Sequence, residues 1–247
     1  MSHIRFAASF LIVVVTCAGS AAAQDRPRGF IGINGGYQAS TTEFDDNFTF
    51  TAHQETGTTR VSYPIDAGPA FDAGAGIRVW RGLGVGVAVS RFTIDSTVSA
   101  TSSIPHPFFL RQNREVSGEA GGIRREETGI HVQAQYSVPL GRRLQLTLMA
   151  GPSLLQVSQA VVIDVNYTEE YPYDTAAFSG VDSTRKKGSK AGFNAGADVR
   201  WMFTRNIGVG VMARFTRATV DLDPVDDRTI TVDAGGAQVG VGLRVGF

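Results

Sequence analysis

Apolar and polar residues alternate along the last eleven positions of the sequence, AQVGVGLRVGF, Ala237–Phe247. The apolar row is Val239, Val241, Leu243, Val245 and Phe247, and the opposite row is Gln238, Gly240, Gly242, Arg244 and Gly246. Because side chains of a β-strand point alternately to its two faces, this period of two predicts a strand with one apolar and one small or polar face. A soluble β-sandwich could contain such a strand, so the rest of the chain has to decide between the two environments.

The same alternation predicts seven further strands, which makes eight in all. They are Gly29–Ser40, Ala70–Trp80, Leu83–Thr93, Thr128–Pro139, Leu144–Val157, Lys190–Phe203 and Ile207–Val220, followed by Thr231–Phe247 as the eighth. Each has about nine residues or more, which is the length that a tilted strand needs to cross a bilayer.

The predicted strands are joined by connections of two kinds. Residues 81–82, 140–143 and 204–206 form very short connections, whereas long segments follow the first, third and fifth strands. In a sheet of antiparallel neighbours, this order puts the short turns at one end of the strands and the long connections at the other. An up-and-down topology follows.

One predicted hairpin occurs twice in the sequence. FDAGAGIRVWRGLGVGVAVSRFT, Phe71–Thr93, is similar to FNAGADVRWMFTRNIGVGVMARFT, Phe193–Thr216. A sheet built from equivalent hairpins produces such a repeat. The repeat is therefore evidence for architecture and carries no information about activity.

The composition of the two faces distinguishes a water-soluble barrel from a membrane barrel. The polar rows are rich in Gly, and the strands after the first contain a single Lys, Lys190, whereas faces in water usually carry many Lys and Glu. Aromatic residues gather near the short turns, as Trp80, Trp201 and Phe247 do, which is typical of an interfacial girdle. In the second strand, strict alternation puts Trp80 itself on the polar row. The predicted fold is all-β, an eight-stranded antiparallel up-and-down transmembrane β-barrel, with its apolar row toward lipid and its polar row in a narrow lumen.

The N-terminal segment has the pattern of a secretory signal peptide. A basic start is followed by the apolar run FAASFLIVVV and an Ala-rich cleavage site, which predicts a signal peptide over 1–23 and a barrel domain over 24–247. The single cysteine, Cys17, lies in the predicted signal peptide, so the mature chain has no disulfide. Removing Arg5 with the signal leaves 22 basic against 23 acidic residues, which gives no argument for a nucleic-acid partner.

From Gly29–Gln38 to Val239–Phe247, the chain resembles the small eight-stranded outer-membrane barrels of Gram-negative bacteria, of the OmpA-domain and OmpX type. The resemblance implies a location in the cell outer membrane, in contact with lipid and lipopolysaccharide. It also implies that the barrel-assembly machinery reads Val241, Leu243, Val245 and Phe247 as a C-terminal signal, although Val245 stands where the family often has an aromatic residue. The long connections would face outward, where they could bind a surface ligand and where Arg124, Arg125 and the Arg185–Lys190 cluster could contact lipopolysaccharide phosphates.

The inward rows predict a polar network in the lumen. Its expected members are Asp72, Arg78, His131, Gln133, Gln135, Asp198, Arg200, Arg214, Gln238 and Arg244. Charges in a confined interior must be paired and hydrogen-bonded, which favours a plug of salt bridges that holds the barrel together. The alternative is a narrow channel for ions or small solutes that prefers anions, because Arg outnumbers Asp in this set.

Catalytic, cofactor and metal motifs are weak in this sequence. A membrane hydrolase would need a nucleophile or activated water beside His131, and Ser137 lies six residues, roughly 20 Å, away along the strand. The GVGV runs lack the strand–loop–helix context of a phosphate loop, and the acidic segment with Asp221, Asp223, Asp226 and Asp227 lacks the glycine turn of an EF-hand. We therefore expect no cofactor and no enzymatic activity. The expected role is structural or surface-interactive, with a narrow channel or an outer-membrane hydrolase as alternatives.

Overall fold

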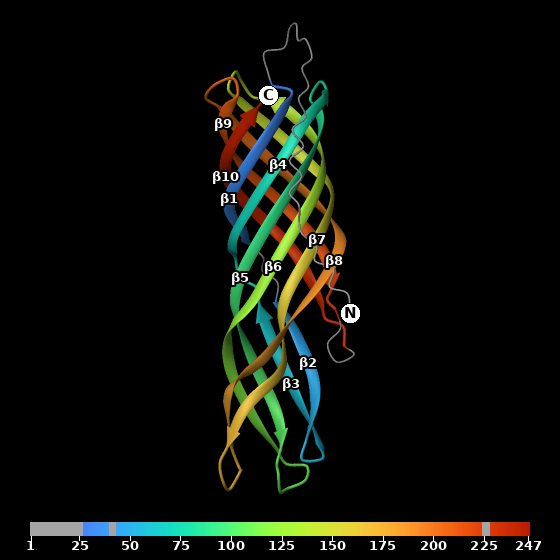
Figure 1. Ribbon diagram of the computed structural model, residues 1–247, viewed down its shortest axis with the longest axis vertical. Helices are drawn as coiled ribbons and strands as arrows, with labels where there is room; N and C mark the ends of the chain where they lie inside the picture. The colour runs from blue at the N-terminus through green and yellow to red at the C-terminus, as the bar shows by residue number, and fades with distance from the viewer. Residues whose placement is uncertain (1–26, 40–42, 224–227) are drawn as a thin grey trace, which may run out of the picture.

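The computed structural model describes residues 27–39, 43–223 and 228–247, which form ten β-strands (Figure 1). The strands are β1 Gly29–Ala39, β2 Glu43–Ala52, β3 Glu55–Pro64, β4 Gly68–Trp80, β5 Leu83–Pro105, β6 Asn113–Pro139, β7 Leu144–Glu169, β8 Ala176–Met202, β9 Ile207–Asp221 and β10 Thr231–Gly246. The predicted signal peptide over 1–23, Cys17, Asp226 and Asp227 lie outside the described residues. Within the described ranges, no helix is long and apolar enough to cross a membrane.

Eight of the strands form a closed antiparallel ring. Around the ring the order is β5-β4-β1-β10-β9-β8-β7-β6, and β5 pairs with β6 to close it. This confirms the all-β fold and the eight-stranded antiparallel barrel. The remaining two strands, β2 and β3, form a hairpin that pairs with the far half of β5, from Thr58↔Ser103 to Ser62↔Ser99. Figure 1 shows the C terminus and the short turns at one end of the molecule and the β2–β3 hairpin at the other.

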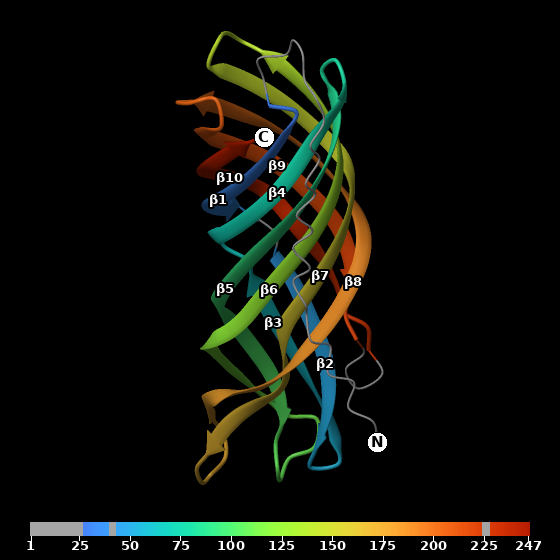
Figure 2. The ribbon, with the colours of Figure 1, turned by 45° about the horizontal axis from the view of Figure 1, so that its top comes forward.

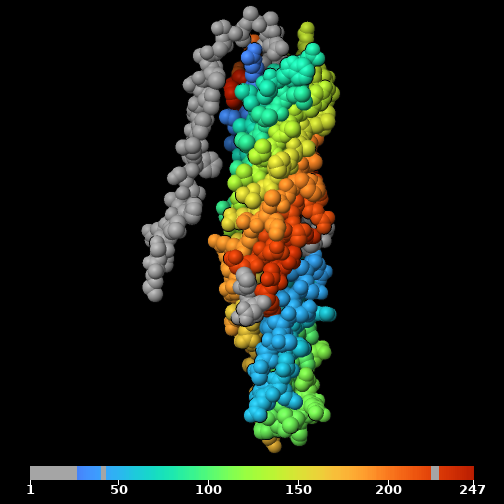
Figure 3. All heavy atoms as spheres, turned by 90° about the vertical axis from the view of Figure 1, so that its right-hand side faces the viewer, coloured from blue at the N-terminus to red at the C-terminus, as the bar shows by residue number. Residues whose placement is uncertain are grey.

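Four strands of the ring are much longer than predicted. β5 continues to Pro105, β6 begins at Asn113, β7 continues to Glu169 and β8 begins at Ala176. The long connections therefore consist largely of strands that extend the wall well past the eight predicted strands, in agreement with the strand-like stretches that the sequence contains at 47–65 and 161–173. Figure 3 shows the resulting rod, with β2 along one side of its lower half.

Strand β9 shows why the sequence pattern changes partway along the wall. Its outward row is apolar from Ile207 to Phe215 and polar at Arg217, Thr219 and Asp221, whereas its inward row changes from Arg214 to the buried Ala218, Val220 and Leu222. Pairing with β10 keeps one register throughout, so each row of β9 faces the same way along the whole strand. The outward row changes from apolar to polar, and the inward row changes from polar to apolar. We call the part with the apolar outer face the membrane barrel. The part beyond it, formed by β2, β3 and residues 94–126, 158–189, 217–223 and 228–234, is the distal extension.

The distal extension has an apolar core of the kind found in water-soluble proteins. Val61, Tyr63, Val98 and Val162 are almost completely buried, and Phe44 stacks on Tyr63 with ring centroids 4.4 Å apart. The Val162 amide donates a hydrogen bond of 2.8 Å to the Tyr63 hydroxyl, and burial raises the pKa of that hydroxyl. Because burial of apolar surface from water drives such packing, the distal extension has the interior of a domain that stands in water.

Trp80 corrects one expectation about the faces. The register between β4 and β5 shifts between Arg78 and Trp80, so strict alternation ends at this bulge. Trp80 is 61% exposed, on the outside of the barrel and not on the polar row, with the Arg81 guanidinium 4.9 Å from its ring centroid. It therefore lies where an interfacial aromatic residue is expected.

The two copies of the repeated hairpin lie on opposite sides of the ring, since β8 is four strand positions from β4. Their last residues differ by a one-residue slip. Arg91 points outward with its side chain 64% exposed, whereas Arg214, its partner in the repeat SRFT and ARFT, points inward and is fully buried. Because neighbouring positions of a strand face opposite ways, a single missing residue moves this arginine from the surface to the lumen.

Candidate functional site

The membrane barrel encloses a polar interior, and the predicted lumen residues lie in it. Nine of the ten are buried: Asp72, His131, Gln133, Gln135, Asp198, Arg200, Arg214, Gln238 and Arg244. The tenth, Arg78, is partly buried near the short-turn end, where its guanidinium donates a hydrogen bond of 2.8 Å to the Pro27 carbonyl oxygen. The alternation of the strands thus places all of these side chains toward one axis.

The layer nearest the short turns is built around Asp198. Arg244 donates to both of its carboxylate oxygens, at 2.6 and 3.2 Å, and Arg200 lies 3.2 Å from the second oxygen. Arg200 also donates to the Thr147 hydroxyl at 3.1 Å, and its guanidinium lies 3.8 Å from the centroid of the Phe30 ring. One carboxylate therefore holds two arginines across the lumen, which is the pairing that a buried charge requires.

The middle layer joins strands on both sides of the β1–β10 seam. Arg214 pairs with Asp72 at 2.8 Å and donates to Gln238 at 2.6 Å, and Asn34 donates to Asp72 at 3.0 Å. Gln238 in turn donates to Gln38 at 2.6 Å. Asn34 and Gln38 were not among the predicted members, although they occupy the inward row of β1 together with Gly32 and Gly36.

The layer at the boundary between the membrane barrel and the distal extension corrects the prediction for Arg125. This residue is 1% exposed in β6, and it donates to Glu127 at 2.7 Å and to the Asp233 carbonyl oxygen at 2.5 Å. Glu127 also accepts hydrogen bonds from Gln38 at 3.0 Å and from the Gly235 amide at 2.9 Å. Arg125 is therefore a structural cation in the interior and does not face lipopolysaccharide. This pair was not predicted from the sequence, because Arg125 and Glu127 precede the predicted strand Thr128–Pro139, whereas β6 begins at Asn113.

His131 lies in a separate cluster, in which the other members are hydroxyl and amide side chains. Its Nε2 is 2.9 Å from the Ser90 hydroxyl and its Nδ1 is 2.8 Å from the Ser153 hydroxyl, so each ring nitrogen has a serine partner. Asn194 donates to Ser153 at 2.8 Å and accepts from Gln133 at 2.8 Å. Ser137 instead pairs with Thr147 at 3.0 Å, so the structure does not bring Ser137 and His131 together as a nucleophile and base. The serines beside His131 are Ser90 and Ser153, which lie on the neighbouring strands β5 and β7 and therefore could not be found from sequence separation.

Glycines on the inward rows make room for these long side chains. A Cβ added at Gly86 would lie 2.1 Å from the Gln135 amide nitrogen, and one at Gly210 would lie 2.8 Å from Nε of Arg244. Two cavities of this interior have volumes of about 50 and 30 Å³, which is room for one or a few water molecules. The side chains thus fill most of the space that eight strands enclose.

The acidic segment after β9 is only partly described. Asp221 accepts hydrogen bonds from Lys190 at 3.2 Å and from Thr231 at 2.9 Å, and these partners lower the pKa of its carboxyl group. Asp223 is exposed, and Asp226 and Asp227 lie outside the described residues. Among the residues that the structure describes, no group of three or more metal-binding side chains gathers.

Comparison with known proteins places the barrel in a family. The model of the outer membrane protein β-barrel domain matches residues 9–244. The crystal structure of the outer membrane protein OprG from Pseudomonas aeruginosa shares the fold at 10% identity and a TM-score of 0.50, covering 90% of this chain and 97% of its own. Neisserial surface protein A matches at 13% identity and a TM-score of 0.47, covering 89% of this chain and 96% of its own. The outer membrane protease OmpT from Escherichia coli matches at 8% identity and a TM-score of 0.46, with the same two coverages, 89% and 96%. A comparison with curated protein sequences finds no match. The chain belongs to the family of outer membrane protein β-barrel domains, and it lies in the outer membrane.

Proposed function

We propose that this chain is a non-catalytic surface-interaction protein, in which the membrane barrel is a closed anchor and the distal extension makes contacts outside the cell. One observation carries the proposal: the segments beyond the membrane barrel fold around their own apolar core and expose a polar face. A prefolded surface can bind a partner without first ordering flexible loops.

The distal extension offers a groove and an open strand edge as contact surfaces. The groove has a volume of about 600 Å³ and is lined by Phe48 and by polar side chains of four strands, including Asn47, Arg60, Thr101 and Glu115. Within the described residues β2 pairs only with β3, so its other edge carries backbone groups that no strand pairs. Extended peptides bind such edges by adding a strand.

Outward charges next to the apolar band support the proposed contact with lipopolysaccharide. Arg91, Arg185, Lys190 and Arg217 lie on the outer face, each near a carboxylate. Lys187 is also exposed. Cations at this level can bind lipopolysaccharide phosphates in place of, or together with, their carboxylate partners.

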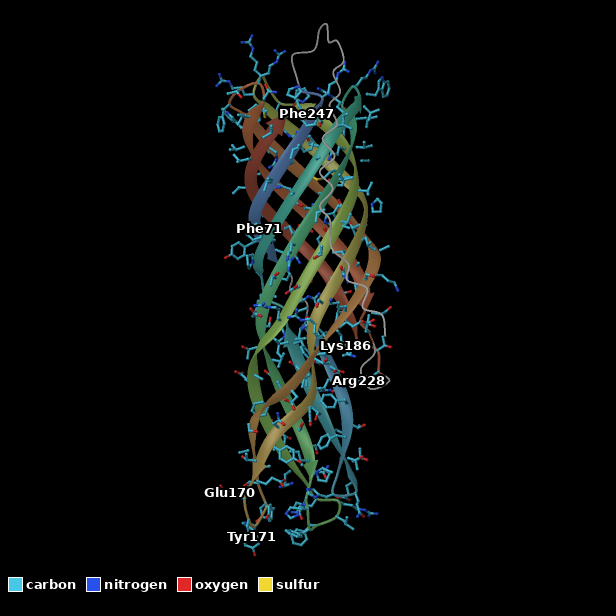
Figure 4. The ribbon with its side chains drawn as sticks, viewed as in Figure 1. Phe71, Glu170, Tyr171, Lys186, Arg228 and Phe247 are labelled. Atoms are coloured by element: carbon cyan, nitrogen blue, oxygen red, sulfur yellow. The ribbon has the colours of Figure 1, made fainter. Side chains whose placement is uncertain are left out.

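The C-terminal residues support the proposed recognition by the barrel-assembly machinery. Val241, Leu243, Val245 and Phe247 all face outward. Phe247 extends the pairing of β10 with β1, because its amide and carbonyl groups exchange hydrogen bonds of 3.0 and 2.8 Å with Gly29 (its position is labelled in Figure 4). The four side chains are thus exposed along one face of the C-terminal segment.

The closed-anchor half of the proposal predicts the electrical behaviour of the protein. Because ion pairs and hydrogen bonds between buried side chains fill the lumen in three layers, we expect the purified protein to give no reproducible conductance steps in planar lipid bilayers. Arg244→Gln should leave this result unchanged, since the other two layers still block the lumen. Steps that appear with the wild type, and whose ion selectivity changes in Arg244→Gln, would establish the narrow channel instead.

The environment of His131 supports the non-catalytic part of the proposal. Both ring nitrogens have serine hydroxyl partners, but His131, Ser90 and Ser153 are all buried, whereas a hydrolytic base must lie within hydrogen-bond reach of a substrate or its attacking group. The Ser90–His131–Ser153 cluster links β5, β6 and β7, so its proposed role is to hold three strands together.

A further inference from the structure

An exposed aromatic patch occupies the end of the distal extension. The β5–β6 and β7–β8 turns place five apolar side chains there: Phe108, Phe109, Leu110, Tyr171 and Tyr173, which we call the distal aromatic patch. Phe108, Leu110 and Tyr171 are 68%, 77% and 84% exposed. Figure 4 shows Tyr171 at the opposite end of the molecule from Phe247. Side chains of this kind at the most remote point of a surface protein indicate a contact site.

Hydrogen bonds within and between three hairpins hold the patch in place. The buried His106 accepts through Nδ1 from the amides of Phe108 and Phe109, at 3.1 and 3.2 Å. Arg114 donates to the Tyr173 carbonyl oxygen at 3.0 Å and pairs with Glu169. The β2–β3 turn joins them, since Glu55 accepts from the Arg111 amide at 2.9 Å. Figure 2 shows these hairpin ends together at the bottom of the molecule. The patch is thus preorganised, which reduces the entropy lost on binding.

The patch lies too far from the membrane barrel to anchor the protein in its own bilayer. From Arg91 to Pro105, β5 runs past the apolar band, and at about 3.3 Å per residue these residues span roughly 50 Å along the strand. The patch therefore faces whatever surface approaches the cell from outside.

Ring geometry and charge identify the kind of surface. Tyr171 and Tyr173 stand at 88° with centroids 6.1 Å apart, and Phe108 meets Tyr173 edge-on at 5.5 Å, so several ring faces are offered together. Aromatic faces attract quaternary ammonium groups, and Tyr is enriched at the headgroup level of bilayers. The exposed Arg111, Glu170 and Asp174 around the patch leave more negative than positive charge, which disfavours anionic lipid.

We propose that the distal aromatic patch docks on an apposed phospholipid bilayer whose surface is zwitterionic and carries phosphocholine headgroups. The proposal rests on the outward orientation of the distal extension, and it names the partner of that surface. Tyr171, Phe108 and Leu110 enter the interface, and the neighbouring carboxylates lie near the choline cations. The excess of negative charge directs the tip away from the anionic lipopolysaccharide of its own kind of membrane.

The test uses the full chain in nanodiscs that contain no phosphatidylcholine, mixed with vesicles of pure phosphatidylcholine or pure phosphatidylglycerol and separated by flotation. We expect the wild type to float with phosphatidylcholine vesicles and less with phosphatidylglycerol vesicles. Phe108→Ser, Leu110→Ser and Tyr171→Ser should each weaken binding by about fivefold, given partial burial of each side chain. Ile163→Ser, which removes an exposed apolar side chain from the flank of the distal extension, should bind as the wild type does. Heat-modifiable gel migration shows that each variant is folded.

The charge prediction has its own variant. Glu170→Gln removes one negative charge and leaves the aromatic residues in place. It should therefore reduce the difference in binding between phosphatidylcholine and phosphatidylglycerol vesicles. Failure of the wild type to float, an equal loss in Ile163→Ser, or stronger binding to phosphatidylglycerol would overturn the proposal. Conductance steps in planar bilayers would overturn the proposal of a closed anchor. They would not bear on vesicle binding by the distal aromatic patch, which the flotation experiment tests independently.

Discussion

Asp198→Ala should lower the free energy of unfolding of the protein by about 3–5 kcal/mol, the cost of leaving a buried charge unpaired. Arg244 and Arg200 both depend on this carboxylate, and both are buried among neighbours that cannot replace its charge. The loss should appear in urea titrations of the protein in lipid vesicles, followed by tryptophan fluorescence and by heat-modifiable migration on gels.

Asp95→Ala is the matched control for this prediction. Asp95 also pairs with an arginine, Arg124, at 2.9 Å, but both side chains are about half exposed on the outside of the distal extension. Removing it should change stability little, because surface ion pairs contribute little. Equal midpoints for the Asp198 and Asp95 variants would contradict the role of the lumen network as the device that holds the membrane barrel together.

Val87→Arg should destabilise the protein by about 2–4 kcal/mol, the cost of a cation on the lipid face of a barrel near the bilayer midplane. Val87 lies on the outward row of β5, is 57% exposed, and sits between other apolar outward residues, Val85 and Val89. Thr101→Arg makes the matched change on the same row of the same strand, in the distal extension. There the new side chain meets water, so we expect no comparable loss.

Folding yield and urea midpoints in lipid vesicles measure both β5 variants. The quantity to compare is the loss of stability in Val87→Arg and in Thr101→Arg, because the two positions share the strand and the direction of the side chain. If Thr101→Arg were as damaging as Val87→Arg, the outward face of the distal extension would not be in water. If neither variant lost stability, the apolar band would not be in lipid.

The strands of the membrane barrel were predictable because their alternation continues along almost their whole length, with the β4 bulge before Trp80 as an exception. In β9, apolar residues occupy every outward position from Ile207 to Phe215, and the same alternation identifies Arg214 as an inward residue. The long turns that the structure replaces with strands illustrate the opposite case. In β5 the apolar residues lie on the outward row up to Val89 and on the inward row from Phe92 to Val98. The apolar outward row therefore ends near Thr93, although the strand continues.

Other features required three-dimensional information. The β6 wall contains a register shift opposite Ser96 and Val98, near Gly122 with φ of 79°, which changes which positions face inward. Asp72 and Arg214 are identifiable as lumen residues from sequence, but their pairing across β1 and β10 depends on ring closure. Glu127 could not be assigned because its strand was expected to begin one residue later.

The outer face of the wall is apolar in the membrane barrel and polar in the distal extension, and the accessibility of positions along β5 tests this change most directly. Cys17 lies in the predicted signal peptide, so single cysteines at Val87, Val89, Ser99 and Thr101 can each carry a spin label in the mature chain reconstituted in lipid. All four positions face outward on one strand. We predict that labels at Val87 and Val89 collide mainly with oxygen dissolved in lipid, and that labels at Ser99 and Thr101 collide mainly with a water-soluble nickel complex. Nickel access at all four positions, or oxygen dominance at all four, would contradict a wall whose outer face contacts lipid in the membrane barrel and water in the distal extension.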